Sequence, residues 1–310
     1  MKVVVTGALG HIGSRFIHTI KRGDFEKVLL IDNMATQRVA TLFNLPQGVA
    51  FRFVEADILT ADLSKLFAGY DAVIHLAAIT NAAGSFAIQD QVENVNYVGT
   101  EKVAQACVAT GCRLVFLSTT SVYGSASEVV DEDCPESDLK PQSPYATSKI
   151  KAEKYLAALS DSQGLKFVTC RFGTIYGTSI GMRFHTAVNK FSWQAVMGGP
   201  ITVWRTAMNQ KRPYLELGDA DRALKFILKN DLFDNRVYNV LTDNVTVGHI
   251  IDILRKYIPD VTVQLVDNQI MNQLSYEVAC ERFEAKGFRF QGKMEEGIKA
   301  TLELLKNVRN

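Results

Sequence analysis

The sequence lacks the features that mark a membrane, secreted or nucleic-acid-binding protein. No apolar run approaches the roughly 20 residues that span a bilayer, which excludes a transmembrane helix. Lys and Arg number 34 against 33 Asp and Glu, so no net positive charge attracts nucleic acid or an anionic membrane. The N-terminal stretch MKVVVTGALGHIG holds an apolar run of only three valines before glycines interrupt it. We therefore expect no targeting segment.

Cysteine and histidine are also sparse. The five cysteines, Cys107, Cys112, Cys134, Cys170 and Cys280, are odd in number and form no Cys-x-x-Cys pair. We expect free thiols and a cytoplasmic location. The five histidines lie far apart and show no metal-ligand spacing, which predicts that the protein has no metal site.

The composition is that of a globular protein, and the first half of the chain has a regular pattern. Of all residues, 47% are hydrophobic and 22% are charged. Short apolar runs alternate with segments of helical periodicity, and the predicted strands are 3–5, 28–31, 51–54, 72–77, 113–118 and 166–172. Strand–helix–strand repetition predicts an α/β fold, a Rossmann-type doubly wound parallel sheet, over residues 1–175.

The second half of the chain is less regular. Residues 176–212 carry glycines and prolines among short apolar runs, which suggests loops. The segment from about 213 to 232 predicts a strand and a helix that rejoin the first domain. Residues 176–212 and 233–310 are then expected to form a smaller C-terminal, substrate-binding domain over the carboxyl ends of the strands.

A glycine-rich segment connects the first predicted strand to the first predicted helix. Gly7, Gly10 and Gly13 let the backbone approach a pyrophosphate, and the helix N-terminus supplies free N–H groups. A tight turn without a ligand is the alternative. Asp32, at the end of the second strand, can accept hydrogen bonds from ribose hydroxyls and would repel a 2′-phosphate. The pair of signals predicts a dinucleotide site that prefers NAD to NADP.

Tyr145 and Lys149 have the spacing of residues one turn apart on a helix. An ammonium beside a phenol lowers the phenol's pKa and prepares it as a general base. A surface pair is the alternative. The preceding strand ends in the hydroxyl-rich run Ser118–Ser121, where a sheet of this type faces its ligand.

These motifs and several others resemble one known family. Besides TGALGHIG and YATSK, the chain carries Asp57–Ile58, HLAA at 75–78, NYVGT at 96–100, RFGTIYG at 171–177 and PITVW at 200–204. Over nearly its whole length it resembles an extended short-chain dehydrogenase/reductase of the NAD-dependent epimerase/dehydratase family.

The resemblance implies a set of site residues. The catalytic residues would be Thr119, which binds the reacting oxygen of a sugar, Tyr145, which removes its proton, and Lys149, which also binds the nicotinamide ribose. For Thr119 an ordinary strand threonine is the alternative. The cofactor-binding residues would be Gly7, Leu9, Gly10, His11, Ile12, Gly13, Asp32, Asn33, Asp57, Ile58, Leu76, Ala77, Ala78, Asn96, Ser118, Tyr145, Lys149 and Phe172. The substrate-binding residues would be Thr80, Thr120, Thr174, Arg183, Asn189, Val203 and Arg212.

Departures from the family pattern restrict the reaction. In the family's 4,6-dehydratases an Asp-Glu pair follows the catalytic Thr, whereas this chain has Thr120 and Ser121. Neither hydroxyl titrates near neutral pH, so elimination of water by that route is not expected. The cations that could neutralise a substrate diphosphate, or could instead be scattered surface charge, are Arg183, Lys190, Arg205, Lys211 and Arg212.

The resemblance predicts an NAD-dependent nucleotide-sugar epimerase, acting at C4 by transient oxidation to a keto sugar and return of the hydride. The alternatives are a nucleotide-sugar 4-dehydrogenase that releases a keto sugar, and a non-catalytic NAD-binding protein. The partner would be a nucleotide sugar, with neither a nucleic acid nor a membrane. The segments Val103–Cys107 and Ile150–Leu159 carry more apolar positions than one core face needs, which favours a homodimer; wider burial within one chain is the alternative.

Overall fold

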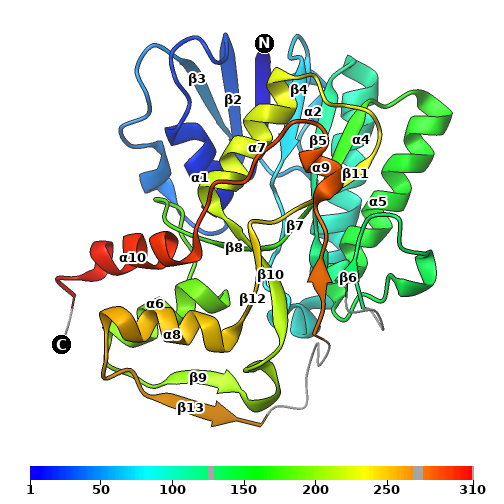
Figure 1. The fold of residues 1–310 in the computed structure, drawn as a ribbon. Coiled ribbons are helices and arrows are strands. Elements are labelled where there is room, and N and C mark those ends of the chain that lie inside the picture. Colours follow the sequence, from blue (N-terminus) through cyan, green and yellow to red (C-terminus); the bar gives the residue numbers. More distant parts are fainter. Residues whose placement is uncertain (125–128, 268–274, 309–310) are drawn as a thin grey trace.

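The computed structural model describes residues 1–124, 129–267 and 275–308. Its centre is a seven-stranded parallel sheet of order β11-β7-β5-β4-β1-β2-β3 (Figure 1). The strands are β1 (Lys2–Thr6), β2 (Lys27–Asp32), β3 (Ala50–Glu55), β4 (Ala72–His75), β5 (Arg113–Thr119), β7 (Phe167–Phe172) and β11 (Val237–Val240). The prediction of a Rossmann-type doubly wound sheet is confirmed, with each predicted strand of the first half in place.

Helices cover both faces of this sheet. One face carries α1 (His11–His18), α7 (Leu217–Lys229) and α9 (Glu281–Glu284), and the other carries α2 (Leu63–Phe67), α4 (Gly99–Thr110) and α5 (Pro144–Gln163). The strands alternate between the two cores: Val3 and Val5 pack under α1, whereas Val4 packs with the helices opposite. This two-sided burial explains why the central strands read as continuously apolar.

A smaller unit lies at the carboxyl ends of the large sheet (Figure 1). It holds the three-stranded sheet of β8 (Thr174–Tyr176), β10 (Lys211–Glu216) and β12 (Asp243–Thr246), and the parallel pair β9 (Ile201–Trp204) and β13 (Val263–Val266). Its helices are α6 (Ala187–Val196), α8 (Val247–Tyr257) and α10 (Met294–Leu305), which share a separate core. A further parallel pair, β6 (Val129–Val130) and β14 (Glu277–Val278), contacts β10 through β14, and α3 (Gln89–Val92) precedes α4.

The sequence predicts that 233–310 belong to the smaller unit, but two parts of this range lie with the large sheet. β11 pairs with β7 as its last strand, and Phe283 and Phe288 pack in the core under α7. A short apolar strand at a sheet edge gives no sequence signal of which sheet it joins. The exact division of the chain into domains stays a prediction.

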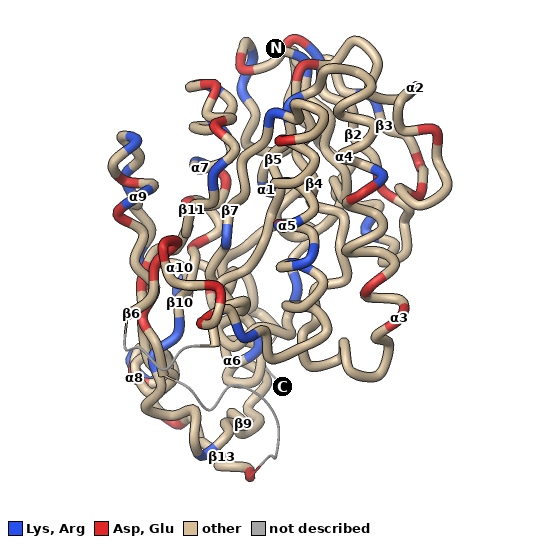
Figure 2. Tube along the Cα trace, turned by 90° about the vertical axis from the view of Figure 1, so that its right-hand side faces the viewer, with Lys and Arg blue, Asp and Glu red and all other residues tan. Residues whose placement is uncertain are grey.

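Charged residues of both signs are interspersed along the chain in the view of Figure 2. None of the described helices is long and apolar enough to cross a membrane. The five cysteines are all unpaired thiols.

The apolar positions on which the homodimer was predicted are largely accounted for within one chain. Val103, Ala104 and Cys107 on α4 pack in the same core as Ala152 and Leu156 on α5. These side chains contact the sheet, so their number gives no support to a second apolar face. The homodimer remains a prediction.

Candidate active site

The segment between β1 and α1 comes closer to a neighbouring strand end than any side chain allows. Gly7 has a φ of +66°, and a Cβ there would lie 2.5 Å from the amide nitrogen of Ala77. A Cβ on Gly13 would lie 2.5 Å from the carbonyl oxygen of Ala8. The first turn of α1 therefore presents its N–H groups to an open space beside bare backbone, which suits a pyrophosphate.

Asp32 ends β2 beside this turn. Its carboxylate accepts hydrogen bonds from the backbone N–H groups of Leu9 (3.1 Å) and Met34 (3.0 Å), which fix its orientation. Next to it, the Asn33 amide donates to Asp57 (2.9 Å). The glycine turn and the two carboxylates thus form one wall at the carboxyl ends of β1, β2 and β3.

A pocket of about 360 Å³ lies against this wall. Twelve predicted cofactor-binding residues line it: Gly7, Gly10, His11, Ile12, Gly13, Asp32, Asn33, Asp57, Ile58, Leu76, Ala77 and Ala78. Thr80 and Arg183, predicted to bind substrate, line it as well. The pocket holds a glycine cradle, a helix N-terminus and a ribose-binding carboxylate, so its residues fit NAD.

Two nitrogen-bearing side chains of the pocket were missed by the sequence analysis. Arg38 and His185 line it together with Arg183. Burial lowers the pKa of His185 to about 4, helped by the two guanidinium groups. Arg38 could have been suspected from its place just after Asp32, but His185 comes from a loop whose path the sequence does not reveal.

Helix α5 carries the predicted catalytic residues Tyr145 and Lys149, which do not line the pocket, as Thr119 does not; Tyr145 lies within electrostatic reach of Arg183, which does line it. The Ser143 hydroxyl accepts a hydrogen bond from the Ala146 N–H (3.2 Å), and Pro144 occupies the first turn, so the helix begins just before Tyr145. The phenol of Tyr145 lies close to the hydroxyl of Thr119 at the end of β5, and this hydroxyl favours the phenolate. Lys149 follows one turn later and is 3% exposed.

The electrostatics of Tyr145 differ from the sequence expectation. Burial raises the pKa of Tyr145, and the groups that act against this are the Arg183 guanidinium and the Thr119 hydroxyl. The expectation that Lys149 lowers the pKa of this phenol is therefore wrong for the protein without ligand. Arg183, whose buried Nε has no hydrogen-bond partner in the part of the chain that the structure describes, is a nearby cation that favours the phenolate.

Lys149 lies in an apolar setting. Its Nζ lies 4.8 Å from the centre of the Phe116 ring, and burial lowers its pKa to about 8, while Glu153 acts in the opposite direction. On its other side, His75 bonds through its two ring nitrogens to the hydroxyls of Thr6 (2.7 Å) and Thr100 (3.2 Å). His75 is thus an interior hydrogen-bonding residue.

The loop from 177 to 186 packs directly on the glycine turn. The His11 ring bonds to the carbonyl of Gly177 (2.8 Å), and the Gly181 N–H donates to the Ser14 hydroxyl (3.0 Å). A Cβ on Gly181 would lie 2.5 Å from the carbonyl oxygen of Leu9. These contacts carry Arg183 into the pocket, where its guanidinium donates to Thr80.

Several predicted ligand-binding residues instead support the walls of the site. Asn96 is fully buried and bonds through its amide to both the N–H (2.8 Å) and the carbonyl (2.9 Å) of Ile79. Asn189 accepts from the Gly177 N–H (3.2 Å) and donates to the carbonyl of Arg183 (2.9 Å). Ser118 donates to the Glu153 carboxylate. Each holds a segment that lines the pocket or carries a catalytic residue.

The remaining predicted residues lie outside the described lining of the pocket. Phe172 packs in a core of the large sheet, and Val203 packs in the core of the smaller unit. The backbone N–H of Leu9 donates to the Asp32 carboxylate. The Thr120 hydroxyl donates to the Phe172 carbonyl (3.3 Å). Thr174 lies on β8, and the Arg212 guanidinium lies 5.4 Å from the ring centre of Tyr276. The structure therefore leaves their roles toward a substrate as predictions.

No group of three or more His, Cys, Asp or Glu suited to a metal ion occurs in the described part of the chain.

Two of the predicted diphosphate-binding cations are engaged in ion pairs, Arg205 with Asp267 (3.2 Å) and Lys211 with Glu277.

Comparisons with known proteins agree with this geometry. A model of the NAD dependent epimerase/dehydratase family matches residues 3–240. A trifunctional UDP-glucose 4,6-dehydratase/UDP-4-keto-6-deoxy-D-glucose 3,5-epimerase/UDP-4-keto-L-rhamnose-reductase of Arabidopsis thaliana is 30% identical over 97% of this chain, which spans only 46% of that relative's length. A UDP-glucose 4-epimerase of Mycolicibacterium smegmatis is 35% identical over 65% of each chain.

Among solved structures, UDP-glucuronic acid 4-epimerase from Bacillus cereus, in complex with UDP-glucuronic acid and NAD, superposes with a TM-score of 0.88. It is 25% identical to this chain, and the match covers 99% of this chain and 100% of that one. The matched range 3–240 spans the glycine turn, Asp32, Thr119, Tyr145 and Lys149. On its sequence, its fold and the layout of its site, the chain belongs to the NAD dependent epimerase/dehydratase family.

Proposed function

We propose that this protein is an NAD-dependent nucleotide-sugar epimerase that inverts C4 of the sugar through a transient 4-keto intermediate. The observation that carries the proposal is the placement of Thr119 close to Tyr145 beside a pocket that fits NAD, with Lys149 one turn along α5. The curated epimerase and the solved epimerase described above support C4 as the reacting carbon.

The chain's own residues can handle the proton of a sugar hydroxyl. NAD, when bound, supplies the reversible two-electron acceptor that oxidation of this carbinol needs. The Thr119 hydroxyl would hold the reacting oxygen, and Tyr145 would take its proton and later return it. Arg183 and Lys149 are the cations near the phenol and the ribose site respectively, so they would favour the charged forms that arise when the substrate binds.

Dehydration is disfavoured at this site. Thr120 occupies the position of the dehydratase acid, and its hydroxyl donates to the carbonyl of Phe172. Ser121 stands in place of the glutamate, and a serine hydroxyl cannot act as a base near neutral pH. We therefore do not assign the dehydratase activity of the plant relative to this chain.

Arg183 favours a particular sugar class within this function. Arg183 lines the pocket, its guanidinium donates to Thr80, and its buried Nε has no hydrogen-bond partner among the described residues. A sugar that carries a carboxylate would supply the missing acceptor and neutralise the charge. UDP-glucuronic acid, the ligand of the solved epimerase, is such a sugar, so uridine-diphosphate uronic acids are our second, narrower candidate.

The experiment that tests the function is a turnover assay on UDP-glucose, UDP-N-acetylglucosamine and UDP-glucuronic acid, with product separation by chromatography. Interconversion of C4 epimers without net change in NADH is expected. Stoichiometric NADH together with a released keto sugar would favour the 4-dehydrogenase instead. Bound NAD without turnover on any sugar of the panel would favour the non-catalytic alternative.

We also propose that the protein works as a homodimer in the cytoplasm. The unpaired state of its five cysteines is consistent with a reducing compartment. For the dimer, the partly buried rings of Tyr97, just before α4, and Tyr155, on α5, meet edge to face 6.3 Å apart and are candidates for the contact. Light scattering of the purified protein measures the mass directly and distinguishes one chain from two.

A further inference from the structure

The buried carboxylate of Glu153 lies on the same face of α5 as the proposed catalytic residues Tyr145 and Lys149. Tyr145, Lys149 and Glu153 follow one another at steps of one turn, so their side chains lie on one side of the helix. Glu153 is only 7% exposed, and Lys149 is 3% exposed. A charged carboxylate so deep in a protein requires strong partners.

Those partners come from the two strands beside α5. The Arg171 guanidinium, on β7, donates from Nη2 to Glu153 (2.6 Å) and from Nε to both carboxylate oxygens (3.1 and 3.2 Å). The Ser118 hydroxyl, on β5, donates to the same carboxylate. Ser118 and Arg171 are register partners in the sheet, so the two donors are fixed side by side.

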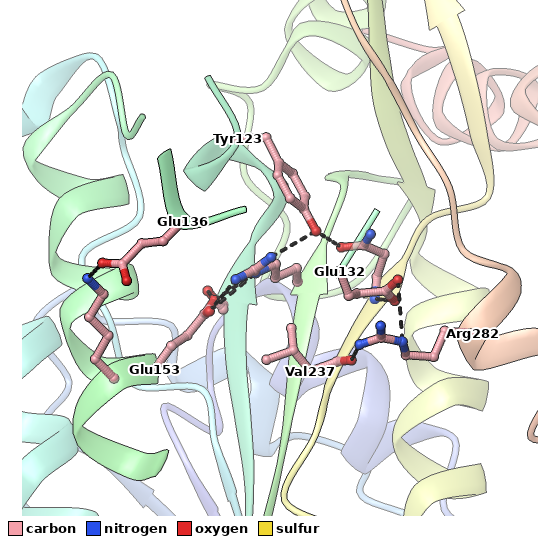
Figure 3. Close-up of polar contacts among 10 residues, drawn as sticks. Tyr123, Glu132, Glu136, Glu153, Val237 and Arg282 are labelled. Carbon is pink, nitrogen blue, oxygen red and sulfur yellow. Dashed lines mark hydrogen bonds and ion pairs between the residues drawn. The ribbon is translucent and has the colours of Figure 1, made fainter. Parts of the chain in front are cut away.

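A second layer of contacts fixes Arg171 in turn. Its Nη1 donates to the Tyr123 hydroxyl (2.9 Å), which donates to the Asn239 amide oxygen (2.8 Å) on β11. In Figure 3, dashed lines join Glu153 to a guanidinium and that guanidinium to Tyr123. The hydrogen bonds identify this guanidinium as that of Arg171. The Asn239 amide group also donates to the carbonyl of Ala279 (2.9 Å). The Glu153 carboxylate is thus held by three strands of the sheet.

Stability alone is a weak reason for this arrangement. Replacement of a buried ion pair by apolar residues of similar volume is often neutral or stabilising. The position of the pair is more informative, because the Lys149 ammonium faces few other charges. His75, from β4, is held neutral by burial, which lowers its pKa to about 3, and β5 offers the Phe116 ring. Arg171, from β7, is a cation, and Tyr145 is a neutral phenol whose pKa burial raises.

We propose that the Glu153 carboxylate, one helical turn from Lys149 and oriented by Arg171 and Ser118, acts through space to favour the charged form of the buried Lys149 ammonium during the reaction. This inference rests on the proposed function only for its consequence in turnover, since the ammonium exists without a substrate. Without Glu153, the Lys149 ammonium would lack a nearby anion that favours its charged form, so it would lose its proton at a lower pH.

The direct test follows the titration of Lys149 by NMR in protein labelled at lysine, with the signal assigned from the Lys149→Met variant. In the parent the midpoint is expected near pH 8. In Glu153→Gln we expect it to fall by about one unit or more, so that at least about tenfold less ammonium remains above the midpoint. The pH dependence of the NAD dissociation constant, measured by calorimetry, is expected to shift in the same direction.

Tyr123→Phe is the matched control, because it breaks the contacts of Arg171 with the second layer but leaves all charges near Lys149 unchanged. Its midpoint is expected to equal that of the parent. An unchanged midpoint in Glu153→Gln, or an equal shift in Tyr123→Phe, would overturn the proposal.

Should Glu153→Gln not fold, the double variant Glu153→Gln with Arg171→Met removes both charges at nearly constant volume. Its midpoint is expected to fall below that of the parent, and a midpoint equal to the parent's overturns the proposal. The titration needs no sugar, so its failure is separate from failure of the epimerase assay.

Discussion

The Thr119 hydroxyl lies close to the Tyr145 phenol and favours its charged form, although Thr119 ends β5 and Tyr145 lies in the first turn of α5. The loop between these elements is long, and the contact depends on the capped start of α5 at Ser143. Because both oxygens meet at the carboxyl end of the sheet, a substrate hydroxyl that approaches one of them also reaches the other.

Tyr145→Phe should separate chemistry from binding. The substitution keeps the ring and its packing but removes the oxygen that would titrate, so folding and NAD affinity should survive. Turnover is expected to fall by about 10²–10⁴-fold, the usual size of a general-base contribution. Steady-state kinetics on an accepted UDP-sugar give the first quantity and calorimetry with NAD gives the second.

Lys149→Met provides the contrast, because loss of its ammonium should damage both turnover and NAD affinity. Near-normal turnover of the Phe variant would show that Tyr145 is not the base.

Asp32→Ala should narrow the preference for NAD. The carboxylate of Asp32 would repel a 2′-phosphate, and Arg38 lines the same pocket. With the carboxylate gone, this guanidinium can attract the phosphate without opposition, so we expect NADP affinity to rise while NAD affinity falls. Dissociation constants for both dinucleotides in both proteins measure the change. Equal affinities for NAD and NADP in the parent would refute the assignment of Asp32.

No nucleotide hexose should lose water during turnover. Thr120 and Ser121 stand where a dehydratase needs an acid and a base, and neither can act as one near neutral pH. Mass spectrometry of reaction mixtures with UDP- and dTDP-glucose is expected to give product masses equal to the substrate mass. A product lighter by one water would contradict this.

Acid should destabilise the fold through His75. Burial holds the pKa of His75 at about 3, against about 6.5 in an unfolded chain, so only the unfolded state gains a proton between these values. The contribution of His75 to stability is therefore complete above pH 6.5 and is lost as the pH falls toward 3. Between pH 7 and 5 this one group should remove about 2 kcal/mol from the free energy of unfolding.

Urea unfolding of the parent and of His75→Gln at the two pH values measures that loss. The Gln variant should lose correspondingly less stability on acidification, with the exposed His249→Gln as control. Equal losses in the parent and in His75→Gln would show that His75 does not carry the effect.

Local signals in the sequence identified the cofactor wall well. The glycine turn and Asp57 follow strands and Asp32 ends one, and the carboxyl ends of adjacent parallel strands are neighbours in space. Their joint position therefore follows from the strand order alone.

Residues that depend on loop paths or long-range pairs could not be found in this way. His185 enters the pocket because Gly181 packs on the glycine turn, a contact between segments far apart in the chain. Glu153 and Arg171 look like surface charges in sequence, yet they pair in the interior. Conversely, Asn96 and Asn189 fitted a ligand-binding pattern, although their amides bond to the backbone of the walls.

The contact between Gly181 and the glycine turn also bears on how a dinucleotide enters and leaves. The loop 177–186 is hydrogen-bonded to His11 and Ser14 of α1. The smaller unit and the glycine turn are therefore connected beside the pocket. Exchange of a bound dinucleotide would require these hydrogen bonds to break together. A long residence time suits an epimerase, which restores its oxidised cofactor within each catalytic cycle and has no need to exchange it.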